Sequence, residues 1–423
     1  MILLVLTAAW NYAMGLLMDK HKGSPKSKAA MVAGIIISLI PLAVFKYSPM
    51  LVDTVNAVLG TAIAQPSLGL PIGISFYTFE CISYLVDTYR GKAPAQRSFF
   101  KLLMFLSLFP QIMSGPIVRY ESLAPQLDHR KVTVQGMTSG ITRFCIGLAK
   151  KVLLANTAGQ LVATFLEGNT AYPTLGVWSG ILAYTLQIYF DFSGYTDMAI
   201  GLARMFGFDY PENFNYPYIS RSITDFWRRW HMSLSSFFRD YVYIPLGGNR
   251  TGHQVRNLFI VWGLTGLWHG ASWNFVVWGL FYFALLVAEK KLYLSKMESW
   301  PRLIAALYSM FFVMIGWALF YFTDMSQGLV AIGAMFGIGA TGFSNMQTNL
   351  LLLNNLWFFL VAIVACGPWA KYIRRIFRGW AAKSRISKHT SISANALFNL
   401  VLLGVSTAML IGETFTPFLY FQF

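Results

Sequence analysis

The chain has 423 residues, of which 56% are hydrophobic and only 12% are charged. Soluble globular proteins carry about 25% charged residues, so this composition argues against a soluble domain and indicates an integral membrane protein. The formal net charge of +16 would favour a nucleic-acid partner in a soluble protein. The sequence has no groove-reading motif or basic–aromatic repeat, so we expect no nucleic acid.

Apolar runs long enough to cross about 30 Å of hydrocarbon recur along the whole chain. Several contain glycines, which indicates interrupted or re-entrant helices. We therefore predict an all-α, polytopic integral membrane protein with roughly 10–11 membrane-associated helices, some of them re-entrant or interfacial. No internal repeat or soluble appendage is visible, so residues 1–423 are predicted to form a single membrane domain. The runs cover residues 1–18, 31–47, 175–188, 258–288, 303–322, 350–366 and 396–411.

The connections between these runs are short and basic. The stretches 20–28 and 90–101 are rich in Lys and Arg, and 371–388 holds seven such residues without Asp or Glu. This bias is typical of cytoplasmic loops, with the lipid bilayer and its anionic headgroups as neighbours. The first apolar run has no basic region before it and no clear small-residue cleavage site. We expect a first membrane helix there, not a removed signal.

Four carboxylates lie within the apolar segments. Glu80 and Asp87 are seven residues apart and share a helix face, where we expect pairing with Arg90 or a neighbouring basic residue. Asp191 and Asp197 punctuate an aromatic run. They could orient a histidine or line a hydrophilic path, and they could equally cap two successive helices.

The cysteines and most histidines give no sign of a metal site. The cysteines lie scattered in apolar segments without paired spacing, so we predict no disulfide framework, no metal and no bound cofactor. Four histidines fall in basic or polar connections, where we expect solvation. These residues are Cys81, Cys145, Cys366, His21, His129, His253 and His389.

The most polar part of the chain covers residues 209–257 and contains one amphipathic helix. Ser222 followed by Asp225 resembles a capping box and predicts a helix start. From 223 to 238, apolar residues recur at three- and four-residue spacing, which predicts one helix lying on or just inside the membrane interface. His231 falls on the apolar stripe. It is either a satisfied core residue or, given its place next to Trp230, a second functional histidine.

His269 is the strongest functional candidate from the residues alone. The segment 257–288 contains no Asp, Glu, Lys or Arg, and His269 is its only group that titrates near neutral pH. Such a residue at membrane depth is a functional candidate, because burying it without purpose costs free energy. The alternative is a neutral histidine that donates one hydrogen bond across a helix interface. Gly266 and Gly270 indicate broken backbone and favour a cavity.

A neutral imidazole suits acyl transfer. Its ordinary pKa of about 6.5 lies near working pH. The ring can therefore accept a proton from a hydroxyl as that oxygen attacks a thioester carbonyl, and such general-base assistance is worth roughly 100- to 10,000-fold. The sequence holds no Gly-x-Ser-x-Gly elbow, so a serine-hydrolase arrangement is unsupported.

Three long motifs resemble the membrane-bound O-acyltransferase (MBOAT) superfamily: RRWHMSL at 228–234, YVYIPLGGNR at 241–250 and WHGASWN at 268–274. Other segments look like its alginate O-acetyltransferase branch, more than the branch that D-alanylates teichoic acid. These are SFYTF at 75–79, YLVD at 84–87, YRG at 89–91, FPQ at 109–111, GPI at 115–117 and the ending YFQF at 420–423. The resemblance covers nearly the whole chain.

The resemblance implies the MBOAT fold, a bundle whose opposing funnels meet near His269, the family's essential histidine, and His231, its partner. His269 would be the general base and His231 would assist. The implied activity moves an acetyl group from a cytoplasmic thioester, typically acetyl-CoA, to an extracytoplasmic polysaccharide such as alginate. The implied partners are a periplasmic or surface enzyme of the SGNH-hydrolase type and the polysaccharide biosynthesis machinery. The implied location is the bacterial cytoplasmic (inner) membrane.

Five further residues, in the motifs around the two histidines and in the aromatic run of Asp191, are expected to bind substrate. Trp268 and Asn274 belong to the motif around His269. Trp230 and Arg228 belong to the motif around His231, and Asp191 lies in the aromatic run.

Two other expectations bear on function and extent. A proton-coupled secondary transporter or lipid-linked flippase could use His269 as a proton relay, although transporters usually carry an internal repeat. The first residues also resemble the second or third helix of family members. One or two amino-terminal helices of the family are therefore expected to be missing.

Overall fold

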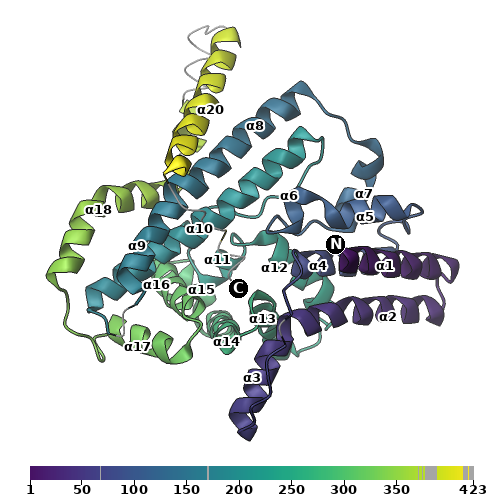
Figure 1. The fold of residues 1–423 in the computed structure, drawn as a ribbon, viewed down its shortest axis with the longest axis horizontal. Coiled ribbons are helices and arrows are strands. Elements are labelled where there is room, and N and C mark those ends of the chain that lie inside the picture. Colours follow the sequence, from purple (N-terminus) through teal and green to yellow (C-terminus); the bar gives the residue numbers. More distant parts are fainter. Residues whose placement is uncertain are drawn as a thin grey trace.

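The computed structural model describes residues 1–66, 68–168, 171–369, 371–373, 375–376, 388–412 and 418. Over these residues it contains helices and connections without any strand, which confirms the predicted all-α class (Figure 1). Two features of the sequence fall outside the described residues: most of the basic stretch 371–388 and the ending at 420–423.

The amino-terminal helices form one group, at the right of Figure 1. They are α1 (Ile2–Lys20), α2 (Pro25–Leu42), the π-helix η1 (Ala43–Tyr47), α3 (Ser48–Leu59), α4 (Ile74–Tyr89), α5 (Phe99–Ser107), α6 (Phe109–Ile112) and α7 (Tyr120–His129). α1 and α2 pack on each other and on α4. α2 continues through η1 into α3, which projects from the bundle and buries none of its residues.

The central layer is built on a long helix pair. Its elements are α8 (Val134–Ala149), the π-helix η2 (Lys150–Asn156), α9 (Thr157–Leu166) and α10 (Thr174–Met205). α8 and α10 cross at glycines: a Cβ atom added to Gly194 would lie 2.8 Å from the carbonyl oxygen of Gly147. Small residues at such crossings let two membrane helices approach closely.

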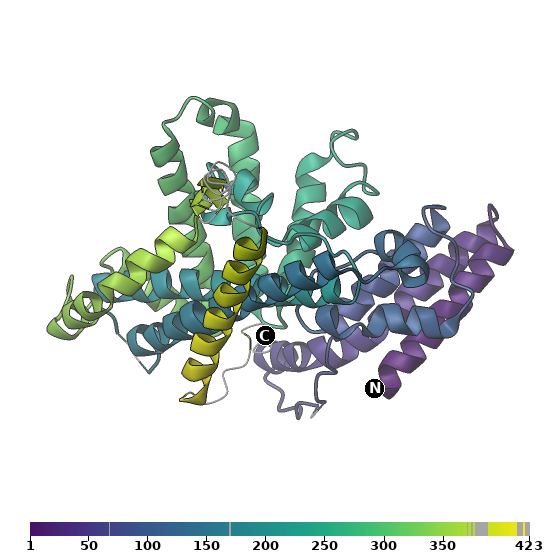
Figure 2. The ribbon, with the colours of Figure 1, turned by 90° about the horizontal axis from the view of Figure 1, so that it is seen from above.

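The remaining helices surround His231 and His269 or extend the bundle beyond them. They are η3 (Pro217–Ile219), α11 (Ile223–Trp227), α12 (Met232–Phe238), η4 (Arg239–Tyr243), α13 (Gln254–His269), α14 (Trp273–Ala288), η5 (Glu289–Tyr293), α15 (Leu294–Met297), α16 (Arg302–Tyr321), α17 (Met325–Met335), α18 (Met346–Ala365) and α20 (Lys388–Ile411). α13, α14 and α16 are seen end-on in Figure 1 and upright in Figure 2, so they cross the α8–α10 layer steeply.

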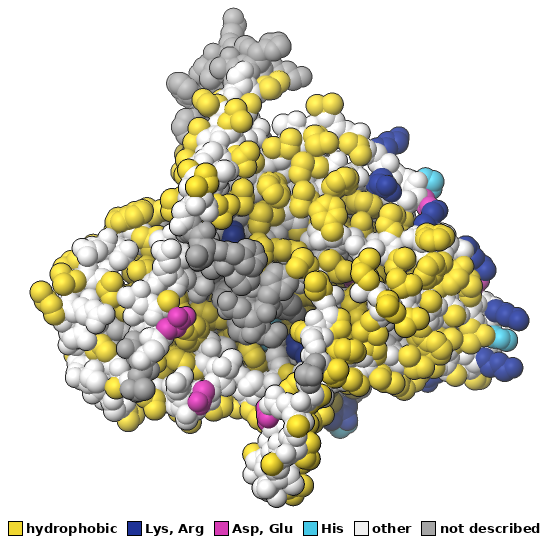
Figure 3. Space-filling view, viewed as in Figure 1, with side chains coloured by type: hydrophobic (Ala, Val, Ile, Leu, Met, Phe, Trp, Pro, Cys, Tyr) yellow, Lys and Arg dark blue, Asp and Glu magenta, His cyan; other side chains and the backbone are white. Residues whose placement is uncertain are grey.

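In the described part of the chain, five helices are long and apolar enough to cross a membrane. They are Ile2–Lys20, Pro25–Leu59, Arg302–Tyr321, Met346–Ala365 and Ile392–Ile411. The face in Figure 3 is mostly hydrophobic, and Lys and Arg gather along the edge formed by the ends of α1, α2, α5 and α7. The chain is therefore a multi-pass membrane protein, as predicted. The predicted 10–11 membrane-associated helices also include shorter segments. The run 258–288, for example, divides into α13 and α14, each of 16 residues, whereas a full span takes about 20.

Buried apolar side chains form two large clusters and a small one. The first surrounds α10, α14 and α16, and the second joins α1, α2, α4 and α5. The small cluster shares α4 with the second and adds α12 and Trp268, at the end of α13. Trp268 therefore lies where the amino-terminal group meets the rest of the bundle.

The predicted continuous helix over 223–238 is wrong. Ser222 does cap its start by accepting a hydrogen bond from the amide of Asp225 at 2.9 Å. The helix ends at Trp227, however, and α12 begins only at Met232. The three- and four-residue apolar spacing survives across the break, so periodicity alone could not reveal it.

The capping interpretation of Asp191 and Asp197 is also wrong, because α10 runs continuously through both. Lys151 pairs with Asp191, while Asp197 accepts hydrogen bonds from Arg143 and Lys150, each at 2.7 Å. Cations from α8 and η2 thus neutralise both carboxylates inside the helix, where an unpaired charge would be costly.

The expected ion pairing of Glu80 and Asp87 is not found among the described residues. Glu80 is 1% exposed, and its Oε2 has no partner there. Asp87 accepts a hydrogen bond from the Tyr241 hydroxyl at 2.8 Å. Arg90 instead donates to the backbone carbonyl of Asp240 at 3.1 Å. Asp87 is therefore bonded to a neutral hydroxyl in place of a cation, and Arg90 to a backbone carbonyl in place of a carboxylate.

Candidate active site

His269 is the last residue of α13, at a break in the backbone. The chain is extended at Gly270 and α14 begins at Trp273, so the predicted interruption beside the histidine is present. The ring is edge-on to Trp278 and Phe320, with centroids 5.0 and 5.3 Å away. Its Nε2 has no hydrogen-bond partner in the described part of the chain. Buried polar atoms are normally paired, so an unpaired ring nitrogen in a pocket wall needs an explanation. A hydrogen bond to a substrate would supply the missing partner.

His231 occupies a strained turn between α11 and α12. Its φ of 44° lies in the left-handed region, which costs a non-glycine residue roughly 1–2 kcal/mol. The amide of the next residue, Met232, donates to the carbonyl of Asn213 at 2.9 Å and so helps to hold the turn. The His231 side chain is buried. Backbone strain of this kind clusters at functional sites.

Asn213 also fixes the orientation of the His231 ring. Its Oδ1 accepts hydrogen bonds from the amide and the hydroxyl of Ser233, at 3.1 and 2.9 Å. The same oxygen lies 3.0 Å from Nδ1 of His231, so this ring nitrogen must carry the proton and donate. In a neutral ring, Nε2 then keeps a free lone pair, and it has no partner among the described residues.

One tryptophan connects the two histidines. The Trp268 ring centroid lies 5.9 Å from that of His231 and 5.1 Å from that of His269. Trp268 itself stacks on Phe79 of α4 at 5.4 Å. The breaks before α12 and after α13 therefore bring two histidines, distant in sequence, to the same aromatic ring.

A first pocket, with a cavity volume of about 40 Å³, opens beside His269. Its wall combines aromatic rings with a few polar groups, as small-molecule sites do. The lining residues are Ser114, Ile188, Asp191, Phe192, Tyr195, Trp230, His269, Trp317, Phe320 and Phe418.

Phe418, near the carboxyl end of the chain, also lines the first pocket. Its ring is edge-on to Tyr195 at 4.7 Å, and the ammonium of Lys151 lies 4.7 Å from the ring centroid. Lys151 also pairs with Asp191, so Phe418 is held over a buried ion pair. Phe418 lies just before the ending at 420–423 that resembles a family motif, and its place in the site was not predicted from the sequence.

A second pocket, with a cavity volume of about 220 Å³, lies between α11–α12 and α13. Its apolar wall includes Trp227, Leu234 and Trp262, and Thr265 lies about one helical turn before the histidine of the first pocket. Two arginines, Arg228 and Arg239, also line it. Apolar walls with cationic groups fit a ligand that has an apolar arm and anionic groups.

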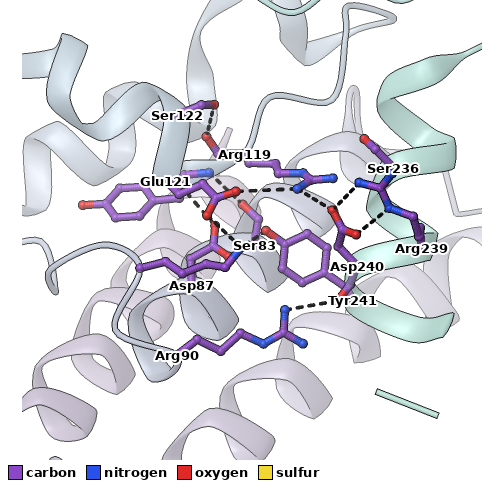
Figure 4. A network of polar contacts seen from close by, with 12 residues as sticks. Ser83, Asp87, Arg90, Arg119, Glu121, Ser122, Ser236, Arg239, Asp240 and Tyr241 are labelled. Atoms are coloured by element: carbon purple, nitrogen blue, oxygen red, sulfur yellow. Dashed lines mark hydrogen bonds and ion pairs between the residues drawn. The ribbon is translucent and has the colours of Figure 1, made fainter. Parts of the chain in front are cut away.

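A network of polar side chains fixes η4 beside the second pocket (Figure 4). Asp240 forms ion pairs with Arg119 and Arg239, each at 2.7 Å. The Tyr241 hydroxyl donates a hydrogen bond to Asp87 of α4. Burial alone would raise the pKa of Asp240, but the hydrogen bonds and charges of Arg239 and Arg119 hold that pKa below its ordinary value. Since Arg239 lines the second pocket, the network positions part of its wall.

Comparison with known proteins decides the family. The MBOAT (membrane-bound O-acyltransferase) family model matches residues 90–295. The chain is 38% identical to the probable alginate O-acetylase of Azotobacter vinelandii, over 93% of this chain and 84% of the relative. The chain belongs to the membrane-bound O-acyltransferase family. Its motifs predicted this, and it is accordingly an acyltransferase, which favours the enzyme over the transporter or flippase alternative.

Two more distant relatives act on other envelope components by name. The peptidoglycan O-acetyltransferase of Helicobacter pylori is 32% identical, over 82% of this chain and 72% of the relative. The teichoic acid D-alanyltransferase of Bacillus subtilis is 29% identical, over 75% and 84%. The higher identity to the alginate enzyme agrees with the branch that the motifs indicated.

Three of the five residues predicted to bind substrate line a pocket of this acyltransferase. Trp230 and Asp191 line the first pocket together with His269, and Arg228 lines the second. Within the motif 228–234, Trp230 and Arg228 therefore line different pockets. Their roles in substrate binding stay predictions.

The other two, Trp268 and Asn274, line neither pocket. Trp268 packs between the histidines, as described above. Asn274 is fully buried, and its amide lies 3.4 Å from the backbone carbonyl of Phe320 at the end of α16. Because Phe320 packs on the His269 ring, Asn274 reaches the site only indirectly.

Proposed function

We propose that this acyltransferase moves an acetyl group from a cytoplasmic thioester, acetyl-CoA, across the membrane for O-acetylation of an extracytoplasmic polysaccharide, alginate or a similar exopolysaccharide. The names of the alginate and peptidoglycan relatives support acetyl as the group and a glycan as the acceptor. The proposed location is the bacterial cytoplasmic membrane, with its basic loops on the inner side.

In the proposed reaction His269 is the general base. Its unpaired Nε2 takes the proton from the attacking hydroxyl while the hydroxyl oxygen bonds to the thioester carbonyl carbon. The carbon–sulfur bond then breaks, and the imidazolium returns the proton to the leaving sulfur. One ester and one thiol form from one thioester and one alcohol. The aromatic wall around the ring keeps water from competing for the acyl group.

His231, whose ring also contacts Trp268, assists. Asn213 holds its Nδ1 proton, so Nε2 is left as an acceptor. An acceptor there can orient the attacking hydroxyl or the donor thioester next to His269.

The second pocket is the proposed donor side. The phosphates of acetyl-CoA are anionic, and Arg228 and Arg239 would pair with them. The network beside this pocket contacts Arg90, which begins the basic stretch 90–101. The positive-inside bias assigns that stretch to the cytoplasm, the compartment that supplies acetyl-CoA.

The first pocket is the proposed acceptor side. It lies near the second pocket at the carboxyl end of α13, because His269 lines the first pocket and Thr265, about one turn earlier, lines the second. By the family resemblance, the acetyl group is then handed to a periplasmic or surface enzyme of the SGNH-hydrolase type, which modifies the polymer and works with the polysaccharide machinery.

The observation that carries the proposal is the unpaired imidazole of His269 in the wall of a pocket. The test is base-labile acetate on the surface polymer of a host whose own copy is deleted. His269→Ala should lower acetate by at least about 100-fold, the range of general-base catalysis, at unchanged protein level in the membrane. His253→Ala, at the other end of α13, is the matched control and should acetylate normally. Normal acetylation by His269→Ala would overturn the assignment.

A further inference from the structure

A buried lysine from the amino-terminal group reaches the end of the helix that carries His269. Lys46 lies in η1 and is 6% exposed. Its ammonium donates to the backbone carbonyls of Trp268 and His269, at 2.6 and 3.2 Å. The neighbouring Tyr47 hydroxyl donates to the carbonyl of Leu267 at 2.7 Å. Two consecutive side chains therefore bind three consecutive carbonyls.

These carbonyls are the ones that a helix end leaves without intrahelical partners. The last four C=O groups of α13 have no amide ahead of them, and they carry the negative end of the helix dipole. A cation is the favoured partner at that position. Here the cation comes from a helix more than 200 residues earlier in the sequence, so the contact is tertiary and not a local cap.

Nothing else in the described part of the chain explains why Lys46 is buried. Among the described residues no ion pair of Lys46 is found, and its ammonium donates to the two backbone carbonyls. Burying an ammonium without a carboxylate is costly, and ionisable groups at membrane depth mark function. π-Helical turns such as η1 are frequent at functional sites, because the extra residue re-aims side chains.

We propose that Lys46 is a positioning residue for acyl transfer: with Tyr47 it clamps the carboxyl end of α13 and so holds the His269 ring in the wall of the first pocket. The proposal rests on the proposed function for the role of His269. The backbone of His269 would otherwise lie at a helix end that frays into the extended Gly270. The clamp also ties the amino-terminal group to the catalytic helix, across the seam that contains Trp268.

The test compares variants in membrane vesicles that contain the acceptor polysaccharide and its acetylation machinery, with acetyl-CoA varied in concentration and release of free CoA thiol as the rate. Lys46→Met should lower kcat by about 100-fold, the effect of misplacing a catalytic group by about 1 Å, while KM for acetyl-CoA stays within about twofold. Lys46→Arg keeps a cation and should recover at least about a tenth of the wild-type kcat. Tyr47→Phe removes one hydrogen bond and should lower kcat by about fivefold. Lys28→Met, an exposed lysine on α2, is the control and should behave as wild type.

A wild-type kcat in Lys46→Met would overturn the clamp, and so would equal losses in Lys46→Met and Lys46→Arg when both are present in the membrane. If Lys46→Met does not accumulate, Tyr47→Phe and Lys46→Arg decide: unchanged kcat in Tyr47→Phe, or an inactive Lys46→Arg, contradicts the proposal. His269→Ala is run in the same assay. An active His269→Ala removes the proposed function itself, whereas an inactive His269→Ala beside an active Lys46→Met removes only the clamp.

Discussion

Two polar regions of this acyltransferase differ in how completely their hydrogen bonds are made. In the network of Figure 4, Asp240 meets Arg119 and Arg239, and Asp87 meets the Tyr241 hydroxyl. Around Trp268, the two histidines are enclosed by aromatic rings. The Nε2 atom of each has no partner among the described residues.

The difference separates a structural role from a chemical one. Buried polar groups are almost always paired, and a satisfied network rigidifies the fold around it. Unpaired ring nitrogens in an aromatic enclosure, by contrast, leave room for atoms of a substrate. We therefore expect substitutions at the histidines to remove activity without unfolding the protein, and substitutions in the network to affect stability more than chemistry.

The sharpest way to break this comparison is to remove the His231 ring while keeping its backbone turn. Asn tolerates the left-handed conformation, so His231→Asn avoids the strain that His231→Ala would add. We expect acetylation to fall by about 100-fold or more, because the acceptor next to Trp268 is lost. Surface-polymer acetate measures the effect.

His231→Gly provides a second check on the same ring, because glycine adopts a positive φ at little cost. Both variants should lose activity while protein level and thermal stability in detergent stay near wild type. Full activity in either would show that His231 is only a packing residue, which was the alternative that its position on an apolar stripe left open.

Asn213 should produce the next largest effect. Asn213→Ala removes the acceptor that fixes the Nδ1 proton of His231, and loss of such a supporting partner typically costs about 10- to 100-fold in activity. Asn213→Asp keeps an acceptor oxygen and should lose less. Asn215→Ala, at an exposed position in the same loop, is the control. Equal activity of Asn213→Ala and Asn215→Ala would contradict the positioning role.

The sequence predicted the elements that depend on local composition. The uncharged stretch 257–288 and its glycines predicted a broken helix at His269, and the break is present at the extended Gly270. Gly266 instead lies inside α13 and lets α14 approach, because a Cβ there would lie 2.4 Å from the carbonyl oxygen of Phe275. The break at His231 was missed, because its apolar spacing is helical on both sides and contains no glycine or proline.

What the sequence could not predict are contacts between distant segments. Asn213 and Lys46 are ordinary polar residues in their own surroundings, and they acquire a role only where folding brings them to His231 and to the end of α13. Asp191 was noticed, but its partner Lys151 comes from a different helix and changes its interpretation from cap to buried ion pair. Tertiary pairing overrides local propensity at all of these positions.

A smaller effect is expected at the second pocket, beside the network of Figure 4. Arg228→Ala should raise KM for acetyl-CoA by about fivefold, as the loss of an exposed ion pair worth about 1 kcal/mol implies, with kcat unchanged. The effect should shrink as salt is raised. Arg256→Ala, an exposed arginine of α13 outside that pocket, should leave KM unchanged. A fall in kcat at constant KM would place Arg228 in the chemistry instead.

The smallest expected effect tests the network of Figure 4, in which the hydrogen bonds are made. Asp240→Asn removes the charge that Arg119 and Arg239 share, and should destabilise the protein by about 1 kcal/mol with kcat unchanged. Because the pKa of Asp240 is lower in the folded state, its carboxylate stabilises the protein above its unfolded pKa of about 3.9, and this contribution is lost as the pH falls through the folded value. The difference in thermal unfolding between wild type and Asp240→Asn in detergent should therefore persist at neutral pH and disappear in strong acid. A difference that grew on acidification would mean that the ion pairs of Figure 4 do not hold η4 in place.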